Sequence, residues 1–165
     1  MTSHPSLTHM NLGHAEIDQQ HEKMLGLADE ILAGFNGGLS ADSLLSLFKE
    51  FRSAVSENFL AENDLMKSCA GSINVIGHKK EHKITLLLID HSITYLRRGV
   101  SINKIKLLMN YIMETISFNM MNYDVELVQA IAISTKSLID QSGVAIGALR
   151  SLASAQHLPS SYALN

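Results

Sequence analysis

Apolar residues recur along this chain at alternating spacings of three and four, which places them on one face of an α-helix. Four stretches of this kind cover residues 18–36, 42–67, 75–98 and 101–124. Glycine- and serine-containing breaks separate them at Gly37–Gly38, at Gly71–Ser72 and at Gly99. Because glycine commonly ends helices and serine commonly begins them, the pattern predicts four long amphipathic helices with short connections.

Helices of this length and spacing favour an all-α fold, an up-down-up-down four-helix bundle. A weaker apolar pattern over residues 137–156, rich in serine and alanine, predicts an additional C-terminal helix. That helix would act either as a cap on the bundle or as a contact for self-association. The expected organisation is a polar N-terminal lead-in (1–14), the bundle (15–135), and a C-terminal helix with its tail (136–165).

Composition narrows the class of protein mainly by exclusion. The net charge of -3 gives no basic footprint for nucleic acid. No apolar run reaches the length of a membrane span, and the polar N-terminus is unlike a signal peptide. The single cysteine, Cys69, has no partner for an internal disulfide. We therefore expect a soluble cytoplasmic protein without nucleic-acid or membrane partners.

Polar residues interrupt the apolar face of the second helix. Its seam runs from Leu44 through Val55 and continues at the same spacing through Asn58, Glu62 and Leu65. A buried carboxylate without a partner is costly, so Glu62 requires a cation or a hydrogen-bond donor.

Histidine and acidic residues interrupt the other three faces. His78 and His82 are four residues apart, so their imidazoles lie one above the other and can converge on one ion. His21 continues the face of the first helix, and Asn119 lies on that of the fourth, with Asp124 one position off it. Carboxylates and imidazoles that converge inside a bundle suit iron, manganese or zinc, and two bridging carboxylates suit a pair of metal ions.

These motifs resemble those of the hemerythrin family, the non-haem di-iron oxygen-binding bundles and their bacterial relatives. The resemblance covers residues 10–130. It rests on Glu16–His21, Asn58–Glu62 followed by Leu65–Met66, His78–His82, and Asn119–Asp124. It implies that His21 and position 58 serve one iron, that His78, His82 and position 119 serve the other, and that Glu62 and Asp124 bridge them. The implied ligands are dioxygen or nitric oxide.

The chain departs from that family at two positions, where Asn58 and Asn119 replace histidines. An amide oxygen is a poorer donor than imidazole, and oxygen-rich ligation shifts preference towards manganese or ferric iron. The expected cofactor is iron, two ions per chain if the family pattern holds or one, with manganese or zinc as alternatives. The resemblance thus implies a hemerythrin-like protein that binds or senses oxygen, nitric oxide or iron, but is not an efficient reversible oxygen carrier. Metal should bind more tightly on the His78/His82 side.

Alternatives stay open at this stage. The same polar residues could form a metal-free hydrogen-bonded network in an interaction or structural module. A non-haem iron oxidase or peroxidase is a further alternative, although no acid–base pair beyond the ligands indicates one. Asn58 and Asn119 are either weak ligands or hydrogen-bonding fillers.

Several other residues with reactive or ligating side chains receive a simpler interpretation. His14 could reach the site if the first helix starts early, and Cys69 is expected to be inert. The remaining histidines are expected to be solvated: His4, His9, His91 and His157. The methionines of the fourth helix are interpreted as core packing: Met109, Met113, Met120 and Met121.

Overall fold

The structure, a computed structural model, describes residues 11–69 and 71–155, and the side chains of residues 11–69, 71–140 and 142. The histidines at positions 4, 9 and 157 lie outside the described residues. The elements in chain order are α1 (Ala15–Gly37), α2 (Ala41–Cys69), α3 (Val75–Arg97), α4 (Ile102–Phe118), η2 (Asn119–Asp124) and α5 (Val125–Ala155).

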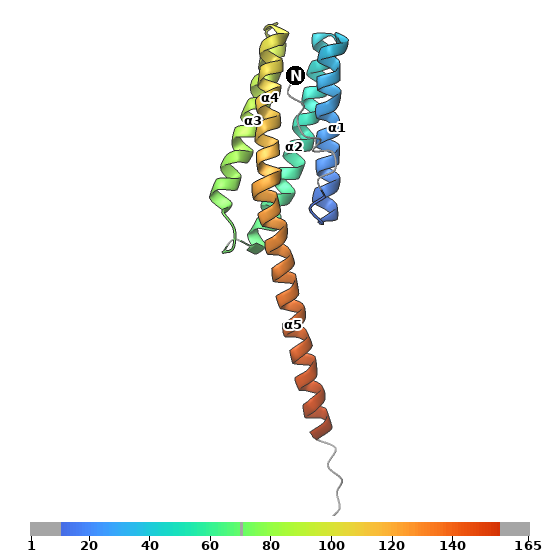
Figure 1. Cartoon of the computed structure of the whole chain (residues 1–165), viewed down its shortest axis with the longest axis vertical. Coiled ribbons are helices and arrows are strands. Elements are labelled where there is room, and N and C mark those ends of the chain that lie inside the picture. The colour runs from blue at the N-terminus through green and yellow to red at the C-terminus, as the bar shows by residue number, and fades with distance from the viewer. Residues whose placement is uncertain (1–10, 70, 156–165) are drawn as a thin grey trace, which may run out of the picture.

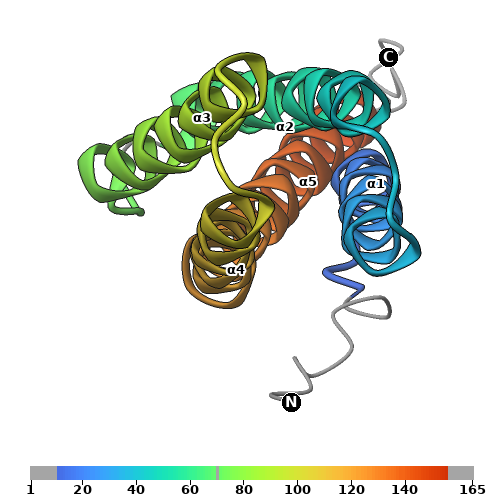
Figure 2. The same ribbon diagram turned by 90° about the horizontal axis from the view of Figure 1, so that it is seen from above.

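The predicted all-α bundle is confirmed. Helices α1 to α4 run alternately up and down (Figure 1), and seen from above they surround a common interior (Figure 2). Helix α1 packs on α2, α2 on α3 and α3 on α4, while α4 closes the ring against α1. The buried core between them consists of aliphatic, phenylalanine and methionine side chains from all four helices. Among the methionines interpreted as core, Met109, Met113 and Met120 are buried, whereas Met121 is exposed.

Local side chains set where the helices begin. Helix α1 starts at Ala15, earlier than the apolar pattern indicated, because His14 caps it: its Nδ1 accepts a hydrogen bond from the Ile17 amide at 3.5 Å. His14 is thereby held outside the polar cluster of the core. Asn74 caps α3 in the same way, with Oδ1 accepting from the Gly77 amide at 2.9 Å.

The buried seam of α2 follows the prediction from Leu44 to Glu62 and then departs from it. Leu65 is half-buried, and Met66 and Cys69 occupy the interior instead. The seam advances by four residues after Glu62 where the sequence analysis assumed three. Because a straight helix has 3.6 residues per turn, either step is compatible with one face.

The additional C-terminal helix is present, and it is an extension of the fourth bundle helix. Helices α4 and α5 are joined by η2 without a break, and α5 then runs far beyond the bundle (Figure 1). The start of α5 packs against α2. Within the part of the chain that the structure describes, no helix is both long and apolar enough to cross a membrane.

Candidate metal centre

Five of the residues proposed as ligands meet in the interior of the bundle. His21 comes from α1, Glu62 from α2, His78 and His82 from α3, and Asp124 from the end of η2. Each is at most 4 % exposed to solvent, although all five are polar. Their burial shows that the four polar interruptions seen in the sequence belong to one level of the bundle.

Glu62 lies at the centre of this cluster. Its Oε2 is 2.8 Å from Nε2 of His82 and 3.3 Å from Nε2 of His78. Its other oxygen, Oε1, faces the opposite way, 3.7 Å from Nε2 of His21. The two oxygens of one carboxylate therefore serve different histidines.

Asp124 divides its oxygens in the same way. Its Oδ1 is 2.9 Å from Nε2 of His78, and its Oδ2 is 3.3 Å from Nε2 of His21. Both carboxylates thus span the space between the His21 imidazole on one side and the α3 imidazoles on the other. One ligand atom each from Glu62, His78, His82 and Asp124 lies within 4.8 Å of the others, which is close enough to hold one metal ion.

Hydrogen bonding leaves these atoms unsatisfied. Neither Glu62 oxygen, nor Oδ1 of Asp124, nor Nε2 of any of the three histidines makes a hydrogen bond of normal geometry, although imidazole and carboxylate atoms lie as close as 2.8 Å. Within the described residues, every buried side-chain nitrogen or oxygen atom of this kind belongs to the five residues or to Asn58, Asn63 and Asn119. Buried polar groups are normally paired, so a concentration of unpaired lone pairs at one point fits a cation that accepts them together.

The π-helical segment η2 explains how Asp124 enters the cluster. In an α-helix, residues five apart point about 140° away from each other, so Asn119 and Asp124 could not both face inward. In a π-helix the bonds join residues five apart, and these share a face. Both side chains are buried, while Tyr123, four residues after Asn119 and therefore on the same face of a regular α-helix, is half-buried. The π-helical segment therefore explains why Asp124 lies one position off the face of Asn119 in the sequence.

The two asparagines at the substituted positions are also buried. Asn58 donates from Nδ2 to Oε1 of Gln20 at 3.3 Å, and its Oδ1 has no partner. Neither amide atom of Asn119 has a partner. An asparagine serving only as a hydrogen-bonding filler would have both groups paired. The free oxygens leave both residues available as weak ligands.

Aromatic rings hold the two α3 histidines in place, a feature that the sequence analysis missed. Phe59 stacks on His82 with ring centroids 3.7 Å apart, and Tyr123 stacks on His78 at 5.0 Å. Gly77 makes room for that tyrosine, because a Cβ there would lie 2.6 Å from its Oη. The apolar periodicity does not predict these contacts. Phe59 and Tyr123 lie next to the polar positions of the site in the sequence, and periodicity does not show which ring an aromatic side chain will contact.

Electrostatics tie the protonation of the histidines to the carboxylates. Burial alone would lower the pKa of His21, but Asp124 and Glu62 outweigh it and raise that pKa to about 9. The same balance raises the pKa of His78 to about 9. Burial would raise the pKa of Glu62, but the three histidines hold it well below its usual range. Without metal the cluster therefore stores protons on imidazole, and a bound metal ion must displace them.

No protein-family model, curated protein or solved structure matches this chain. The fold and the cluster define a class on their own: a helical bundle with a buried set of carboxylates and imidazoles that can hold a metal ion.

Proposed function

We propose that this chain is a hemerythrin-like non-haem metal protein that binds iron and through it binds or senses oxygen, nitric oxide or iron availability. The observation that carries the proposal is the division of both carboxylates between His21 and the α3 histidines. A carboxylate whose two oxygens face different imidazoles is arranged to bridge two ions. In a single-ion site, by contrast, the second oxygen of each carboxylate would only pair with the His21 imidazole.

The two metal positions of this proposal have unequal donor sets. One receives the imidazoles of His78 and His82 with Oε2 of Glu62 and Oδ1 of Asp124. The other receives the imidazole of His21 with the remaining carboxylate oxygens. Because imidazole is the stronger donor for late first-row metals, the first position binds more tightly. Asn58, one turn before Glu62, supplements the weaker position with a neutral oxygen.

The donor set also selects the chemistry that a bound metal can supply. Two histidines with a carboxylate are the ligands of non-haem iron centres that keep open positions for a small ligand. Asparagine oxygens in place of two imidazoles favour manganese or ferric iron, so reversible oxygen carriage should be inefficient. The chain's own residues exclude bulk water from the cluster and hold the imidazoles of His78 and His82 by stacking.

Elemental analysis of protein purified without a histidine tag tests this proposal. Iron should be present above one ion per two chains after reconstitution with ferrous iron under nitrogen, and should fall when Glu62→Ala removes one of the two bridging carboxylates. An exposed control on α2, Glu50→Ala, should bind as the native chain does. Native protein that stays free of iron, manganese and zinc after reconstitution would contradict the proposal.

A metal-free structural or interaction module is the second candidate, and the imidazole–carboxylate distances favour it. Protonated His78 and His21, at 2.9 Å and 3.3 Å from the two oxygens of Asp124, could neutralise the buried acids without a metal. The two candidates differ in thermal denaturation with added metal. A metal that binds only the folded chain raises the melting temperature, whereas the module is indifferent to metal.

A further inference from the structure

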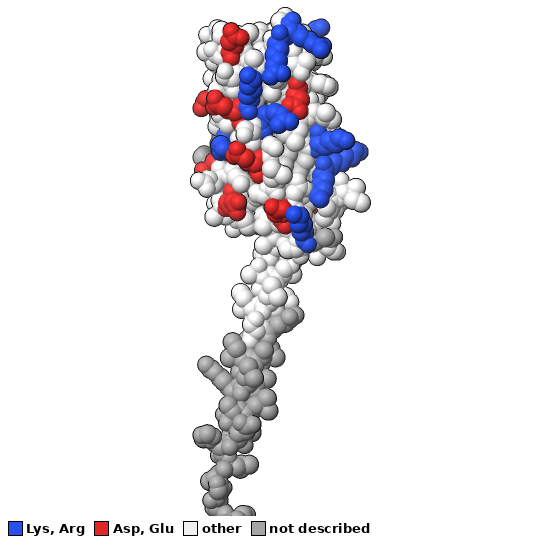
Figure 3. Space-filling view, turned by 180° about the vertical axis from the view of Figure 1, so that it is seen from behind, with Lys and Arg blue, Asp and Glu red and all other residues white. Residues whose placement is uncertain are grey.

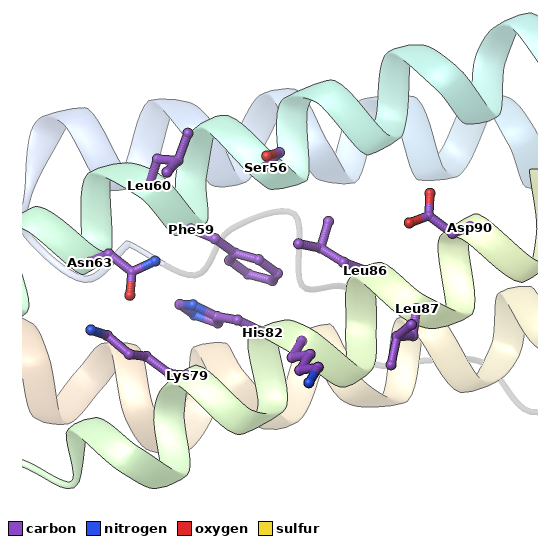
Figure 4. Close-up of a pocket in the computed structure, with 10 residues that line it drawn as sticks. Ser56, Phe59, Leu60, Asn63, Lys79, His82, Leu86, Leu87 and Asp90 are labelled. Atoms are coloured by element: carbon purple, nitrogen blue, oxygen red, sulfur yellow. The ribbon is translucent and has the colours of Figure 1, made fainter.

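A cavity of about 320 Å³ opens between α2 and α3 on the outer side of the metal cluster. Figure 4 shows its wall of apolar side chains: Phe59 and Leu60 come from α2, and Leu86 and Leu87 from α3. Leu60 is 63 % and Leu87 49 % exposed, so both carry apolar surface that an occupant would cover. The size is that of a small-molecule site rather than of a peptide groove.

Polar groups without partners gather at one end of this cavity. Asn63 and Lys79 lie beside His82 at that end (Figure 4). Nδ1 of His82 is buried without a hydrogen-bond partner, while Nε2 of the same ring faces Glu62. Oδ1 of Asn63 is likewise buried and unpaired. Buried polar groups are normally satisfied, so these atoms mark the polar end of the cavity. Oδ1 of Asn63 only accepts hydrogen bonds, whereas Nδ2 of the same amide can donate one to an acidic occupant.

The charges at the two ends of the cavity differ. Lys79 and Lys83 line it, and within the described residues neither has an ion-pair partner. At the far end Asp90 is neutralised by Arg52, at 2.5 Å and 3.1 Å from its two oxygens. Figure 3 views the face formed by α2 and α3, where basic side chains gather along the α3 side. The exposed lysines of the cavity wall, without an acidic partner in the described part of the chain, therefore favour an anionic occupant.

We propose that this cavity binds a small amphipathic carboxylate, such as a medium-chain fatty acid. The carboxylate lies at the Asn63 end, where Lys79 supplies positive charge and the Asn63 side chain supplies an amide N–H donor. Lys83, one turn further along α3, adds positive charge to the wall of the cavity. The alkyl chain lies along Leu60, Leu86 and Leu87 towards the Asp90 end. Charge at one end and apolar walls along the rest are complementary to this class of molecule and to neither a nucleotide nor a sugar.

The site is distinct from the metal cluster but shares one side chain with it. His82 presents Nε2 to the cluster and contributes its outer edge to the cavity. Because Phe59 stacks on the same ring, an occupant contacts both members of the stack. The proposal rests on the cavity alone, so carboxylate binding is expected in metal-free protein as well, and failure of the metal proposal would leave it standing.

Calorimetric titration of the full chain with octanoate tests the proposal, with octanol as the uncharged comparison. Octanoate should bind about tenfold more tightly than octanol, as expected for one charge-assisted contact. The double variant Lys79→Gln, Lys83→Gln should lose that advantage. Lys80→Gln, an exposed neighbour that does not line the cavity, should keep it. Circular dichroism checks that all variants are folded.

Location is tested separately by following the side-chain amide signals of Asn63 by NMR during the titration. These signals should shift with octanoate and not with acetate, which lacks the apolar chain. No octanoate binding at millimolar concentration would overturn the proposal. Equal affinity for octanoate and octanol would overturn the carboxylate class. Equal losses in the Lys79/Lys83 and Lys80 variants would place the anion elsewhere and overturn the site.

Discussion

Asn119 and Asp124 lie five positions apart in the sequence, yet both side chains are buried on the inner face of one continuous helix. The π-helical bonding of residues 119–124 makes this possible by absorbing one extra residue in a single turn. The extra residue is solvent-facing, since Met121 and Asn122 are exposed. With this spacing in the sequence, Asn119 and Asp124 can both face the site only because the helix changes its period locally.

Deleting Met121 should therefore leave the site intact. Asn119 and Asp124 become four residues apart, which still places them on one face of an ordinary α-helix. Iron binding should stay within about threefold of native, as for a surface change. Deleting Glu114, an exposed residue in regular α4, should instead rotate one part of the helix by about 100° against the other and impair binding. Calorimetric iron titrations of both variants make the comparison, and strong loss in the Met121 deletion would show that the π-turn itself is required.

The unequal donor sets predict unequal effects of histidine removal. His82→Ala takes an imidazole from the tighter position and should cost more iron than His21→Ala. The loss of a ligand should exceed the roughly 10–100-fold cost of losing a ligand's hydrogen-bonding partner. His91→Ala, an exposed histidine on α3, controls for general effects on that helix. Iron content after dialysis against graded chelator concentrations measures the order, and equal losses would remove the asymmetry.

Metal-free protein should lose stability between about pH 6.5 and 9. His21 and His78 have folded-state pKa values of about 9 against 6.5 in the unfolded chain. Their contribution is fully present below 6.5 and lost as the pH rises through 9; for one imidazole it amounts to about 3 kcal/mol. The two share the same carboxylates, so the total is less than twice that. The lowered pKa of Glu62 acts oppositely: its contribution is present above about 4.5 and lost in more acidic solution.

Iron-loaded protein should show the reverse trend over the same alkaline window. Metal displaces the imidazole protons, so binding strengthens as the pH rises and those protons are given up more easily. Urea denaturation midpoints at pH 6, 7.5 and 9, with and without iron, test both trends. A metal-free midpoint that does not change from pH 6.5 to 9 would show that the histidines are neutral in the folded protein.

The apolar periodicity predicted the bundle and the buried polar residues that meet inside it, because both depend only on which residues share a helical face. The partners of Glu62 followed from the cost of burying a carboxylate, and the structure places three histidines around it. The π-segment did not follow, since Ile116, Asn119 and Tyr123 fit an α-helical stripe equally well. Stacking of Phe59 on His82 was also hidden, because ring geometry is set by tertiary packing.

The run from α4 into α5 was missed for a related reason. The apolar pattern weakens after Ile131, and this weakening indicates a separate helix from residue 137 onwards. Weak amphipathicity marks a helix that leaves the core, however, and no glycine or proline lies between Asp124 and Lys136 to break it. A helix can therefore continue without the pattern that reports burial.

The substitutions at positions 58 and 119 give the most demanding test of the hemerythrin-like proposal. If these asparagines weaken an otherwise complete di-iron site, the double variant Asn58→His, Asn119→His should restore it. Both asparagines are buried with unpaired oxygens, so the new imidazoles would start at the right level of the bundle.

Iron content in that double variant should approach two ions per chain, and a visible absorption band that depends on air should develop that the native protein lacks. Each single variant should gain less, because it repairs one donor set while the bridging carboxylates require both ions.

Iron should also raise the melting temperature of the double variant more than that of the native chain, since metal binds only the folded state. Imidazole is larger than the amide, and crowding in a packed core costs about 1–3 kcal/mol, so the metal-free variant should melt lower than native. Asn103→His, at an exposed position of α4, controls for added histidine. A folded double variant that takes up no more iron than the native chain would mean that these two positions do not limit the site, and would favour the metal-free module.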